Sequence, residues 1–131
     1  MSGNLPRYST RVRDLFARLP GAQGLAPGKG TVVAGEAMAL DRGAWVCFEA
    51  RIDRGRVSDC AFRSWGCPHV LAAAAWVCAE VRGLAVDAAG AIDARRLAEA
   101  LDAPAEKMGR LLVVEDAMHA LFAQARAVQS A

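Results

Sequence analysis

A tight turn at Asp53-Arg54-Gly55 constrains this chain more than any other feature, because it separates two runs of alternating β-type sequence, 45–52 and 56–64. A glycine-containing turn between two such runs is a strong short-range signal for an antiparallel hairpin. A two-residue turn at this point places Ile52 opposite Val57. The same register predicts the pairs Phe48 with Ala61, Glu49 with Cys60, and Cys47 with Phe62.

A third β-type run, 31–40, precedes the hairpin, so the sequence predicts an antiparallel meander of three strands. Three strands alone bury too little apolar surface to be stable, which means that helices must cover one face of the sheet. The order of the elements, a helix, three strands and then further helices, predicts an α+β fold.

The segment 8–19 carries apolar residues at helical spacing, with Ser9 or Thr10 as its candidate N-cap. Its apolar stripe consists of Val12, Leu15, Phe16 and Leu19. Pro20-Gly21 ends this helix, and the glycine-rich residues 21–30 are typical of a loop.

Downstream of the strands, residues 68–82 predict a nearly all-apolar and therefore buried helix that ends at Gly83. A further helix is expected over 94–101 with Asp93 as its N-cap. Pro104 begins a short turn after it.

The last helix is expected over about 111–128, since apolar residues recur there at helical spacing. Glu115 and His119 lie one turn apart on it and are expected to form a solvent-facing pair. The apolar stripe of this helix consists of Val114, Met118, Leu121, Ala125 and Val128.

Composition favours one globular domain over residues 1–131, with 1–7 and 129–131 as flexible tails, because 54% of the 131 residues are hydrophobic and the net charge is only +2. The longest uninterrupted apolar run is 70–79, too short to span a membrane, and the chain begins without an apolar leader. We therefore expect a cytoplasmic protein with no membrane contact. Its 16 basic and 14 acidic residues are interspersed, which argues against a nucleic-acid partner.

Two common enzyme motifs are incomplete or missing. The Gly-Lys-Gly-Thr string at 28–31 lacks the first glycine of a phosphate-binding loop, and no apolar strand precedes it. The chain also has no Gly-x-Ser-x-Gly nucleophile elbow. We therefore expect neither nucleotide nor hydrolase chemistry, and a protein that is not an enzyme.

The four cysteines are separated by 13, 7 and 11 residues, which fits neither a zinc site built from paired cysteines nor a secreted disulfide framework. Cys47 and Cys60 fall on predicted strands, and Cys78 falls in the middle of a predicted helix. These three are expected to act as small core residues.

Cys67 differs from the other cysteines because Gly66-Cys67-Pro68-His69 lies where a strand ends and a buried helix begins. Cys67 is thus expected at the N-cap and Pro68 at the first helical position. Free N–H groups and the helix dipole would lower the pKa of the Cys67 thiol and make it a nucleophile or a soft ligand. The alternative is a thiol that merely packs in the core. His69 is either a second ligand or an ordinary solvated helix residue.

Glu36 is the carboxylate that interrupts the apolar run 31–40. An edge or solvent-facing position explains it without any chemistry. Together with Cys67 and His69 it would also supply the mixed oxygen, sulfur and nitrogen ligands that a single zinc or iron ion accepts.

Four blocks of this chain resemble the IscU/NifU-type scaffold family of iron–sulfur cluster assembly, in the same order along nearly the whole sequence. The Asp59–Cys67 block resembles the family's D-A-x-F-x-x-x-G-C signature, and Glu115-Asp116-Ala117 resembles the A-E-D-A segment of its last helix. The blocks are Tyr8-Ser9, Gly35-Glu36-Ala37-Met38-Ala39-Leu40, Asp59-Cys60-Ala61-Phe62-Arg63-Ser64-Trp65-Gly66-Cys67 and Val113-Val114-Glu115-Asp116-Ala117.

The resemblance implies an α+β fold that carries a cluster at one exposed end, held by three cysteines and an aspartate, with sulfur supplied by a cysteine desulfurase. The family's first cysteine falls on Ala34, its aspartate on Glu36 and its second cysteine on Cys67. Its His-Cys pair before the last helix falls on Gly109-Arg110.

Two further family segments are altered in this chain. The helix after Cys67, where the family has small hydroxyl residues, contains Ala73-Ala74-Ala75. The family's L-P-P-V-K chaperone-recognition segment corresponds to 103–107, which keeps Pro104 and Lys107 as candidate partner contacts.

A [2Fe–2S] cluster held within one chain needs four protein ligands, whereas the matched positions offer Glu36, Cys67 and His69. Arg110 in place of a cysteine adds a permanent cation, which favours a thiolate or persulfide over a metal ion. We therefore expect a divergent scaffold-like protein that acts in iron–sulfur or sulfur-transfer metabolism through Cys67, a candidate persulfide acceptor. Its partners would be a cysteine desulfurase or other assembly proteins.

Three alternatives stay open. Two chains could share a bridging cluster, each contributing Cys67 with Glu36 or His69. The chain could be a structural or regulatory binding module that kept the fold after losing the cluster ligands. It could also hold a single zinc ion at Glu36, Cys67 and His69.

Overall fold

The structure is a computed structural model that describes the backbone of residues 9–19 and 21–130, and the side chains within these ranges except at 15–18, 89–91 and 129–130. The expected tail at 1–7 lies outside the described residues, as do the side chains of Leu15 and Phe16. The elements in chain order are α1 (Thr10–Arg18), β1 (Thr31–Ala39), the 3-10 helix η2 (Leu40–Arg42), β2 (Ala44–Asp53), β3 (Arg56–Trp65), α2 (Pro68–Val81), the 3-10 helix η3 (Val86–Ala91), α3 (Ala94–Leu101), the 3-10 helix η4 (Ala105–Lys107) and α4 (Met108–Ser130).

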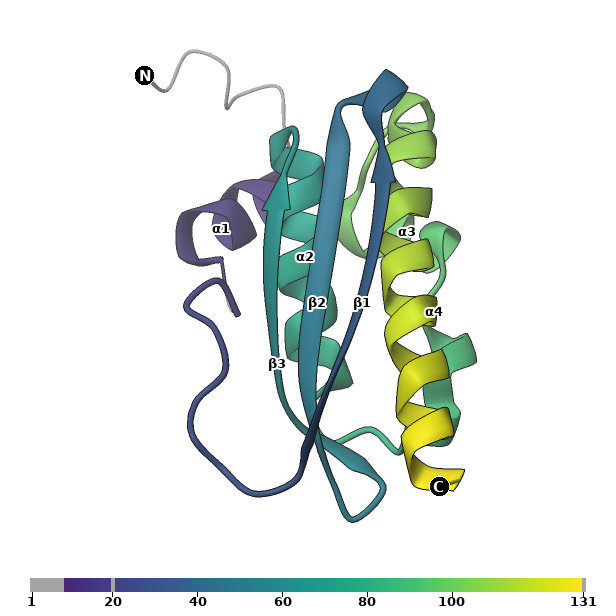
Figure 1. Cartoon of the computed structure of the whole chain (residues 1–131). Helices are drawn as coiled ribbons and strands as arrows, with labels where there is room; N and C mark the ends of the chain where they lie inside the picture. The colour runs from purple at the N-terminus through teal and green to yellow at the C-terminus, as the bar shows by residue number, and fades with distance from the viewer. Residues whose placement is uncertain (1–8, 20, 131) are drawn as a thin grey trace.

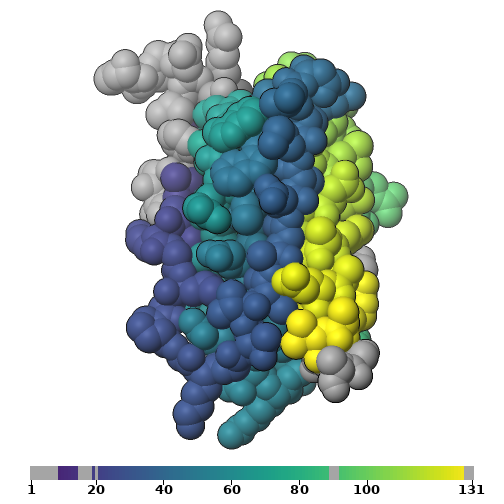
Figure 2. Space-filling model, viewed as in Figure 1, coloured from purple at the N-terminus to yellow at the C-terminus, as the bar shows by residue number. Residues whose placement is uncertain are grey.

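The three strands form one antiparallel sheet in the order β1-β2-β3, and α2 and α4 pack against it (Figure 1). This arrangement confirms the predicted α+β fold with a helix-covered meander. The opposite face of the sheet is in view in Figure 2, between α4 and the segment that leads into β1. Within the described residues, no helix is both long and apolar enough to cross a membrane.

The core lies between the sheet and the helices. Alternate residues of β2 point into it, since Val46, Phe48 and Ala50 are fully buried. The helices contribute Val70, Ala74, Val77, Leu111, Val114, Met118, Leu121 and Phe122, which are also fully buried. Four residues of the apolar stripe predicted for the last helix are thus buried, whereas its fifth, Val128, is exposed.

The β2–β3 hairpin has the predicted turn but a different register beyond it. Ile52 pairs with Val57 as predicted, whereas Arg51 pairs with Asp59, which leaves Ser58 as an extra residue. Such a bulge shifts every later pair by one residue and exchanges the two faces of the strand. The observed pairs are therefore Phe48 with Phe62, Glu49 with Ala61, Cys47 with Arg63 and Ala50 with Cys60, and the predicted partners were wrong by one residue.

Both strand connections contain the tripeptide Asp-Arg-Gly. In the hairpin, Arg54 and Gly55 have φ values of 54° and 76°, the left-handed conformation that two-residue turns require. The predicted strand over 31–40 ends at Ala39, and Leu40–Arg42 form η2 instead. Gly43 closes that turn with φ 62° and donates its N–H to the Leu40 carbonyl at 3.1 Å.

The predicted helix caps are confirmed. The Val12 N–H donates to Ser9 Oγ at 3.2 Å, and the Arg96 N–H donates to Asp93 Oδ1 at 2.7 Å. Cys67 is the N-cap of α2, with Pro68 at the first helical position. The last helix starts earlier and ends later than predicted, at Met108 and Ser130.

His119 is exposed as predicted and Glu115 is half-buried, but the two side chains bond other partners and not each other. Glu115 Oε1 accepts the Ala94 N–H at 2.6 Å, and His119 Nε2 lies 3.1 Å from the Ile92 carbonyl oxygen. Both side chains therefore attach α4 to the segment that begins α3, a long-range contact that helical spacing could not indicate.

Candidate functional site

Three chain segments meet at the end of the molecule where α2 and α4 begin (Figure 1). Gly66, with φ 152°, brings the β3–α2 turn close to η2, since a Cβ built on it would lie 3.3 Å from the Gly43 carbonyl oxygen. Arg110 Nε donates to the Arg42 carbonyl at 3.1 Å and joins α4 to η2. We call the region formed by Arg42, Cys67, His69, Lys107 and Arg110 the Cys67 end.

Cys67 is partly exposed and has an extended backbone with φ −74° and ψ 168°. Its carbonyl accepts the N–H groups of Val70 and Leu71 at 3.0 and 3.2 Å, which starts the helix. Its sulfur makes no capping hydrogen bond. The thiol is therefore available for chemistry, and its activation by the helix terminus stays a prediction.

His69 is buried, with 2% of its surface exposed, so the alternative of a solvated helix residue is wrong. Burial lowers the pKa of the His69 imidazole below its ordinary value of 6.5. The positive charges of Lys107 and Arg110 lower this pKa further, against a smaller opposing effect of Glu106. His69 is therefore neutral at neutral pH and adds no positive charge to the site.

The permanent positive charge of the Cys67 end comes from Arg42, Lys107 and Arg110. In the described part of the chain, none of these three side chains has a carboxylate oxygen within 4.0 Å. Cations without an ion-pair partner stabilise an anion placed among them. The electrostatics of this end therefore suit a thiolate or persulfide better than a bare metal cation.

Glu36 lies on the sheet face opposite the helices. It is exposed and opposite Cys47 in the β1–β2 register, and its carboxylate accepts the indole N–H of Trp45 at 2.9 Å. Among the residues that the structure describes, no three His, Cys, Asp or Glu side chains are placed to hold one metal ion. Glu36, Cys67 and His69 are therefore not brought together as a set of metal ligands.

The other cysteines are buried, as predicted. Cys60 and Cys78 have no exposed surface and belong to the core between β3 and α2. Cys47 is also buried, at 9% exposure, but its register partners Glu36 and Arg63 place it on the face of β2 away from the helices. Cys47 is therefore a small buried residue as predicted, but it lies outside the main core cluster, because a position on β2 alone does not say which face a residue takes.

The residues of η2 were missed by the sequence analysis. Arg42 lies at the Cys67 end, with its guanidinium against Gly109, where the resemblance places a histidine. Asp41, also on η2, is an exposed carboxylate. The repeated Asp-Arg-Gly tripeptide at 41–43 was the available signal, since the same tripeptide marked the hairpin turn.

Pro104 and Lys107, the candidate partner contacts, lie at the start and end of the short connection before α4. Pro104 is the exposed N-cap of η4, and Lys107 is its last residue. Because Lys107 lowers the pKa of His69 electrostatically, this connection lies near His69. Their role in partner binding stays a prediction.

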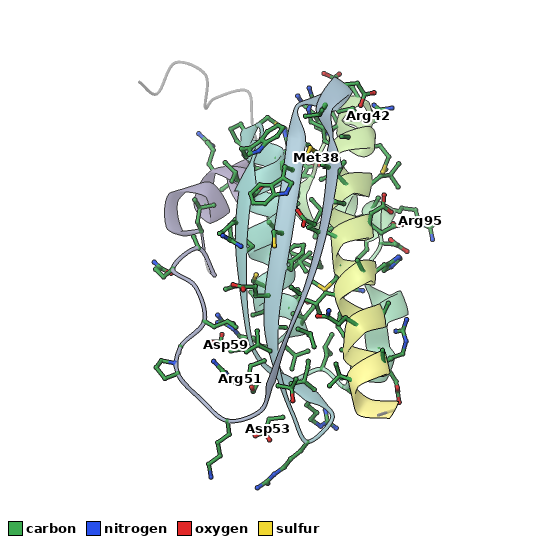
Figure 3. All side chains as sticks on the ribbon, viewed as in Figure 1. Met38, Arg42, Arg51, Asp53, Asp59 and Arg95 are labelled. Carbon is green, nitrogen blue, oxygen red and sulfur yellow. The ribbon has the colours of Figure 1, made fainter. Side chains whose placement is uncertain are left out.

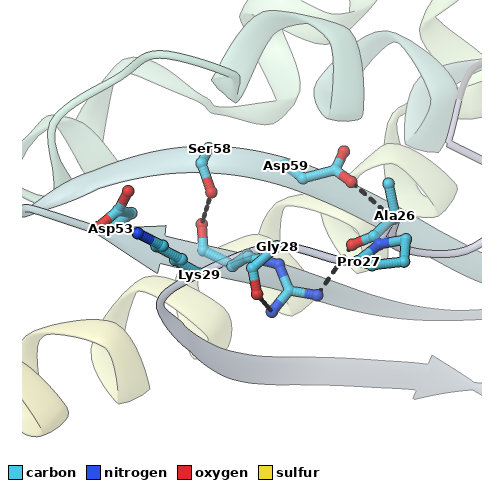
Figure 4. A pocket seen from close by; sticks show the side chains of 8 residues that line it. Ala26, Pro27, Gly28, Lys29, Asp53, Ser58 and Asp59 are labelled. Atoms are coloured by element: carbon cyan, nitrogen blue, oxygen red, sulfur yellow. Dashed lines mark hydrogen bonds between the residues drawn. The ribbon is translucent and has the colours of Figure 1, made fainter.

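A hollow of about 250 Å³, which we call the Arg51 hollow, lies toward the other end of the sheet (Figures 3 and 4). The Arg51 guanidinium donates to the carbonyls of Gly28 and Ala26 at 3.1 and 2.9 Å, and Asp59 accepts the Ala26 N–H at 3.0 Å. These contacts hold the loop before β1 against the hairpin. The hollow is therefore separate from the Cys67 end, where Figure 3 labels Arg42.

Sequence comparison identifies relatives in iron–sulfur cluster assembly. The family model described as NifU-like N terminal domain matches residues 7–129. The chain is 32% identical over 77 residues to the iron–sulfur cluster assembly scaffold protein IscU of Haemophilus influenzae, covering 59% of this chain and 61% of that protein. It is 32% identical over 79 residues to the protein of the same name from Escherichia coli, covering 60% and 62%. The chain thus spans about three fifths of the length of these relatives.

Solved structures share the fold. A putative iron–sulfur cluster assembly scaffold protein for the SUF system, from Fervidobacterium islandicum, superposes with a TM-score of 0.64 at 14% identity, covering 92% of this chain and 99% of that one. The N-terminal part of a nitrogen-fixing NifU-like protein from Brucella abortus superposes with a TM-score of 0.53 at 21% identity, covering 93% and 83%.

Proposed function

Because this chain belongs to the NifU-like N-terminal domain family and is scaffold-like in iron–sulfur cluster assembly, we propose that its Cys67 accepts sulfur from a cysteine desulfurase. The observation that carries the proposal is the partly exposed Cys67 thiol at an end with three cations that have no ion-pair partner among the described residues. The protein would act as a sulfur carrier within the assembly machinery, not as an enzyme.

The transfer is a thiol–persulfide exchange. The Cys67 thiolate attacks the terminal sulfur of a persulfide on the desulfurase. A new S–S bond forms on Cys67, the S–S bond on the desulfurase breaks, and the desulfurase cysteine leaves as a thiolate, so no electrons are gained or lost overall. Arg42, Lys107 and Arg110 stabilise the negative charge that Cys67 carries before and after the exchange.

The ligand set disfavours a cluster held within one chain. A [2Fe–2S] cluster needs four protein ligands, most often thiolates. Of the four positions that the resemblance assigns, only Cys67 has a thiol, because the others are Ala34, Glu36 and Arg110. A cluster would therefore be cargo shared with a second chain or a partner. Anaerobic reconstitution that yields a coloured dimer with iron and sulfide would support the shared form over sulfur transfer alone.

Intact-protein mass spectrometry tests the proposal. After incubation with a cysteine desulfurase and L-cysteine, the wild type should gain one sulfur atom that dithiothreitol removes. Cys67→Ala should gain none, whereas the matched control Cys47→Ala should behave as the wild type. An adduct that persists in Cys67→Ala, or no adduct on the wild type, would contradict the proposal.

The incomplete ligand set favours a second candidate function, a non-catalytic binding module that retains the scaffold fold. In this case the contact of Arg110 with the Arg42 carbonyl replaces the ligand site with a structural link. Binding of an assembly protein that is equal for the wild type and Cys67→Ala, together with no sulfur adduct on either, would favour the module.

A further inference from the structure

Two buried thiols lie side by side in the core, outside the Cys67 end. Cys60 on β3 and Cys78 on α2 have Sγ atoms 3.3 Å apart, within hydrogen-bonding distance for sulfur. Both residues have no exposed surface. The bulge at Ser58 is what turns Cys60 toward α2, since it exchanges the faces of β3.

We propose that Cys60 and Cys78 form a redox-active dithiol that a small peroxide converts to a disulfide between β3 and α2. A disulfide has an S–S length of about 2.0 Å, so its formation requires the two sulfur atoms to approach by little more than 1 Å. Both cysteines lie on regular elements packed against each other, which holds the sulfur atoms close together. This proximity favours bond formation within the chain over reaction with an external thiol.

A buried loop residue, Gly21, packs directly on the pair. Gly21, with φ 90°, lies against it so closely that a Cβ there would be 2.9 Å from Cys78 Sγ. The Gly21 carbonyl accepts the Phe62 N–H at 3.0 Å, which keeps this loop segment on the edge of β3. A small molecule such as hydrogen peroxide therefore reaches the pair only when this segment moves.

The oxidation proceeds in two balanced steps. The Cys60 thiolate attacks one oxygen of hydrogen peroxide, and the O–O bond breaks to give a sulfenic acid and hydroxide. The Cys78 thiol then attacks the sulfenic sulfur, which forms the S–S bond and releases water. Overall, two thiols lose two hydrogen atoms and one peroxide becomes two water molecules.

We assign the first attack to Cys60 because Cys78 is held in its thiol form. The hydrogen bond with Cys60 and burial both raise the pKa of the Cys78 thiol far above its ordinary value, and the nearby carboxylate of Asp59 adds to this effect. Arg82, which bonds the Cys60 carbonyl at 3.3 Å and pairs with Asp59 at 3.1 Å, opposes it. Cys78 is therefore assigned as the thiol that attacks in the second step.

Peptide mapping tests the dithiol directly on the wild-type protein. The chain is treated with hydrogen peroxide, unfolded, alkylated with iodoacetamide and digested. We expect a cross-linked peptide that contains Cys60 and Cys78, with Cys47 alkylated. Alkylation of both Cys60 and Cys78 in peroxide-treated protein, or a disulfide that joins either of them to another cysteine, would overturn the proposal.

Variants separate this pair from the other thiols. Cys78→Ala should lose the cross-link, whereas Cys47→Ala and Cys67→Ala should retain it, so the result is independent of sulfur acceptance at Cys67. Oxidation should also raise Tm by several degrees in the wild type and in Cys47→Ala, because the bond closes a loop between residues 18 positions apart. If Cys78→Ala does not fold, the wild-type map and its Tm shift still decide the question, and an unchanged Tm would count against the proposal.

Discussion

Arg110 shows how one substitution changes the chemistry available to a site. The resemblance places a cysteine at this position, and the sequence predicted that a cation there would favour an anionic sulfur. The structure adds that Arg110 is anchored to the Arg42 carbonyl and that Lys107 lies on the adjoining turn. The charge at the Cys67 end is therefore the sum of three residues from two distant parts of the chain.

Arg110→Ala should slow sulfur transfer to Cys67 several-fold, because it removes one of the cations that stabilise the anionic sulfur. The rate at which the one-sulfur adduct appears on the intact protein measures this effect. Arg95→Ala is the matched control, since Arg95 is an exposed arginine on α3 (Figure 3). Equal rates for the two variants would show that the charge at the Cys67 end has no role in the transfer.

His69 makes the stability of the fold depend on pH. The pKa of its imidazole is lowered in the folded state, by burial first and then by Lys107 and Arg110, so the unfolded chain binds a proton more readily below pH 6.5. The contribution of neutral His69 to the free energy of unfolding is complete above pH 6.5. It is lost as the pH falls from 6.5 through the lowered pKa of the folded state. Because one proton is bound, the free energy of unfolding cannot fall by more than about 1.4 kcal/mol per pH unit.

Urea unfolding of the wild type and His69→Gln between pH 7.5 and 5 measures this contribution. The wild type should lose more free energy of unfolding over that interval than the variant, because glutamine does not titrate. Parallel curves for the two proteins would contradict the assignment to His69.

Gly35 allows α4 to pack directly against β1. A Cβ at this position would lie 2.6 Å from the Ala117 carbonyl oxygen and would also collide with the backbone of Leu121, so α4 rests on β1 without an intervening side chain. The Ala34 N–H, at the free edge of β1, donates to Gln124 Oε1 of α4 at 2.6 Å. The close backbone contact at Gly35 and the hydrogen bond from Ala34 together hold α4 on the edge strand β1.

Gly35→Ala should destabilise the fold by about 1–3 kcal/mol, since neither backbone can yield without shifting a whole element. Chemical denaturation gives the free energy of unfolding. Gly28→Ala is the control, because the new Cβ would meet only the flexible Arg51 side chain at 3.3 Å. A loss no greater than that of the control would mean that α4 adjusts freely over β1.

At the scale of the whole molecule, the Cys67 end and the Arg51 hollow lie at opposite ends of the sheet (Figure 3). The chain has two lysines, and one lies at each end: Lys107 at the Cys67 end and Lys29 beside the hollow. This distribution allows the two ends to be tested separately with the same substitution.

Lys107→Glu should weaken binding to a cysteine desulfurase about tenfold if the partner approaches Cys67, because the substitution reverses a charge at the contact. Lys29→Glu should leave the affinity within twofold of the wild type. Titration calorimetry or biolayer interferometry with the purified desulfurase measures both. The reverse order of effects would place the partner at the other end of the molecule.

Metal removal should leave the stability of this chain unchanged. Because no three potential ligands converge among the described residues, we expect no resident ion to contribute to folding. Thermal unfolding with and without a chelator should give the same Tm within about 1 °C. A drop of several degrees on chelation would reveal a ligand set that the described residues do not form.

The sequence by itself determined the features that depend on neighbouring residues. The Asp53-Arg54-Gly55 turn, the Asp93 cap and the position of Cys67 before Pro68 follow from local backbone preferences, so they could be predicted before any fold was known. The order of these elements then indicated the α+β class, and the spacing of its motifs indicated the family.

Only the tertiary structure decided the features that depend on contacts between distant residues. One extra residue at Ser58 exchanges the faces of β3 and brings Cys60 to Cys78, and the packing of α2 buries His69. Arg42 reaches Arg110 across 68 positions of sequence, while Glu36 stays on the far face of the sheet. Side-chain spacing along a strand or helix fixes only relative orientation, and long-range packing decides which residues share a site.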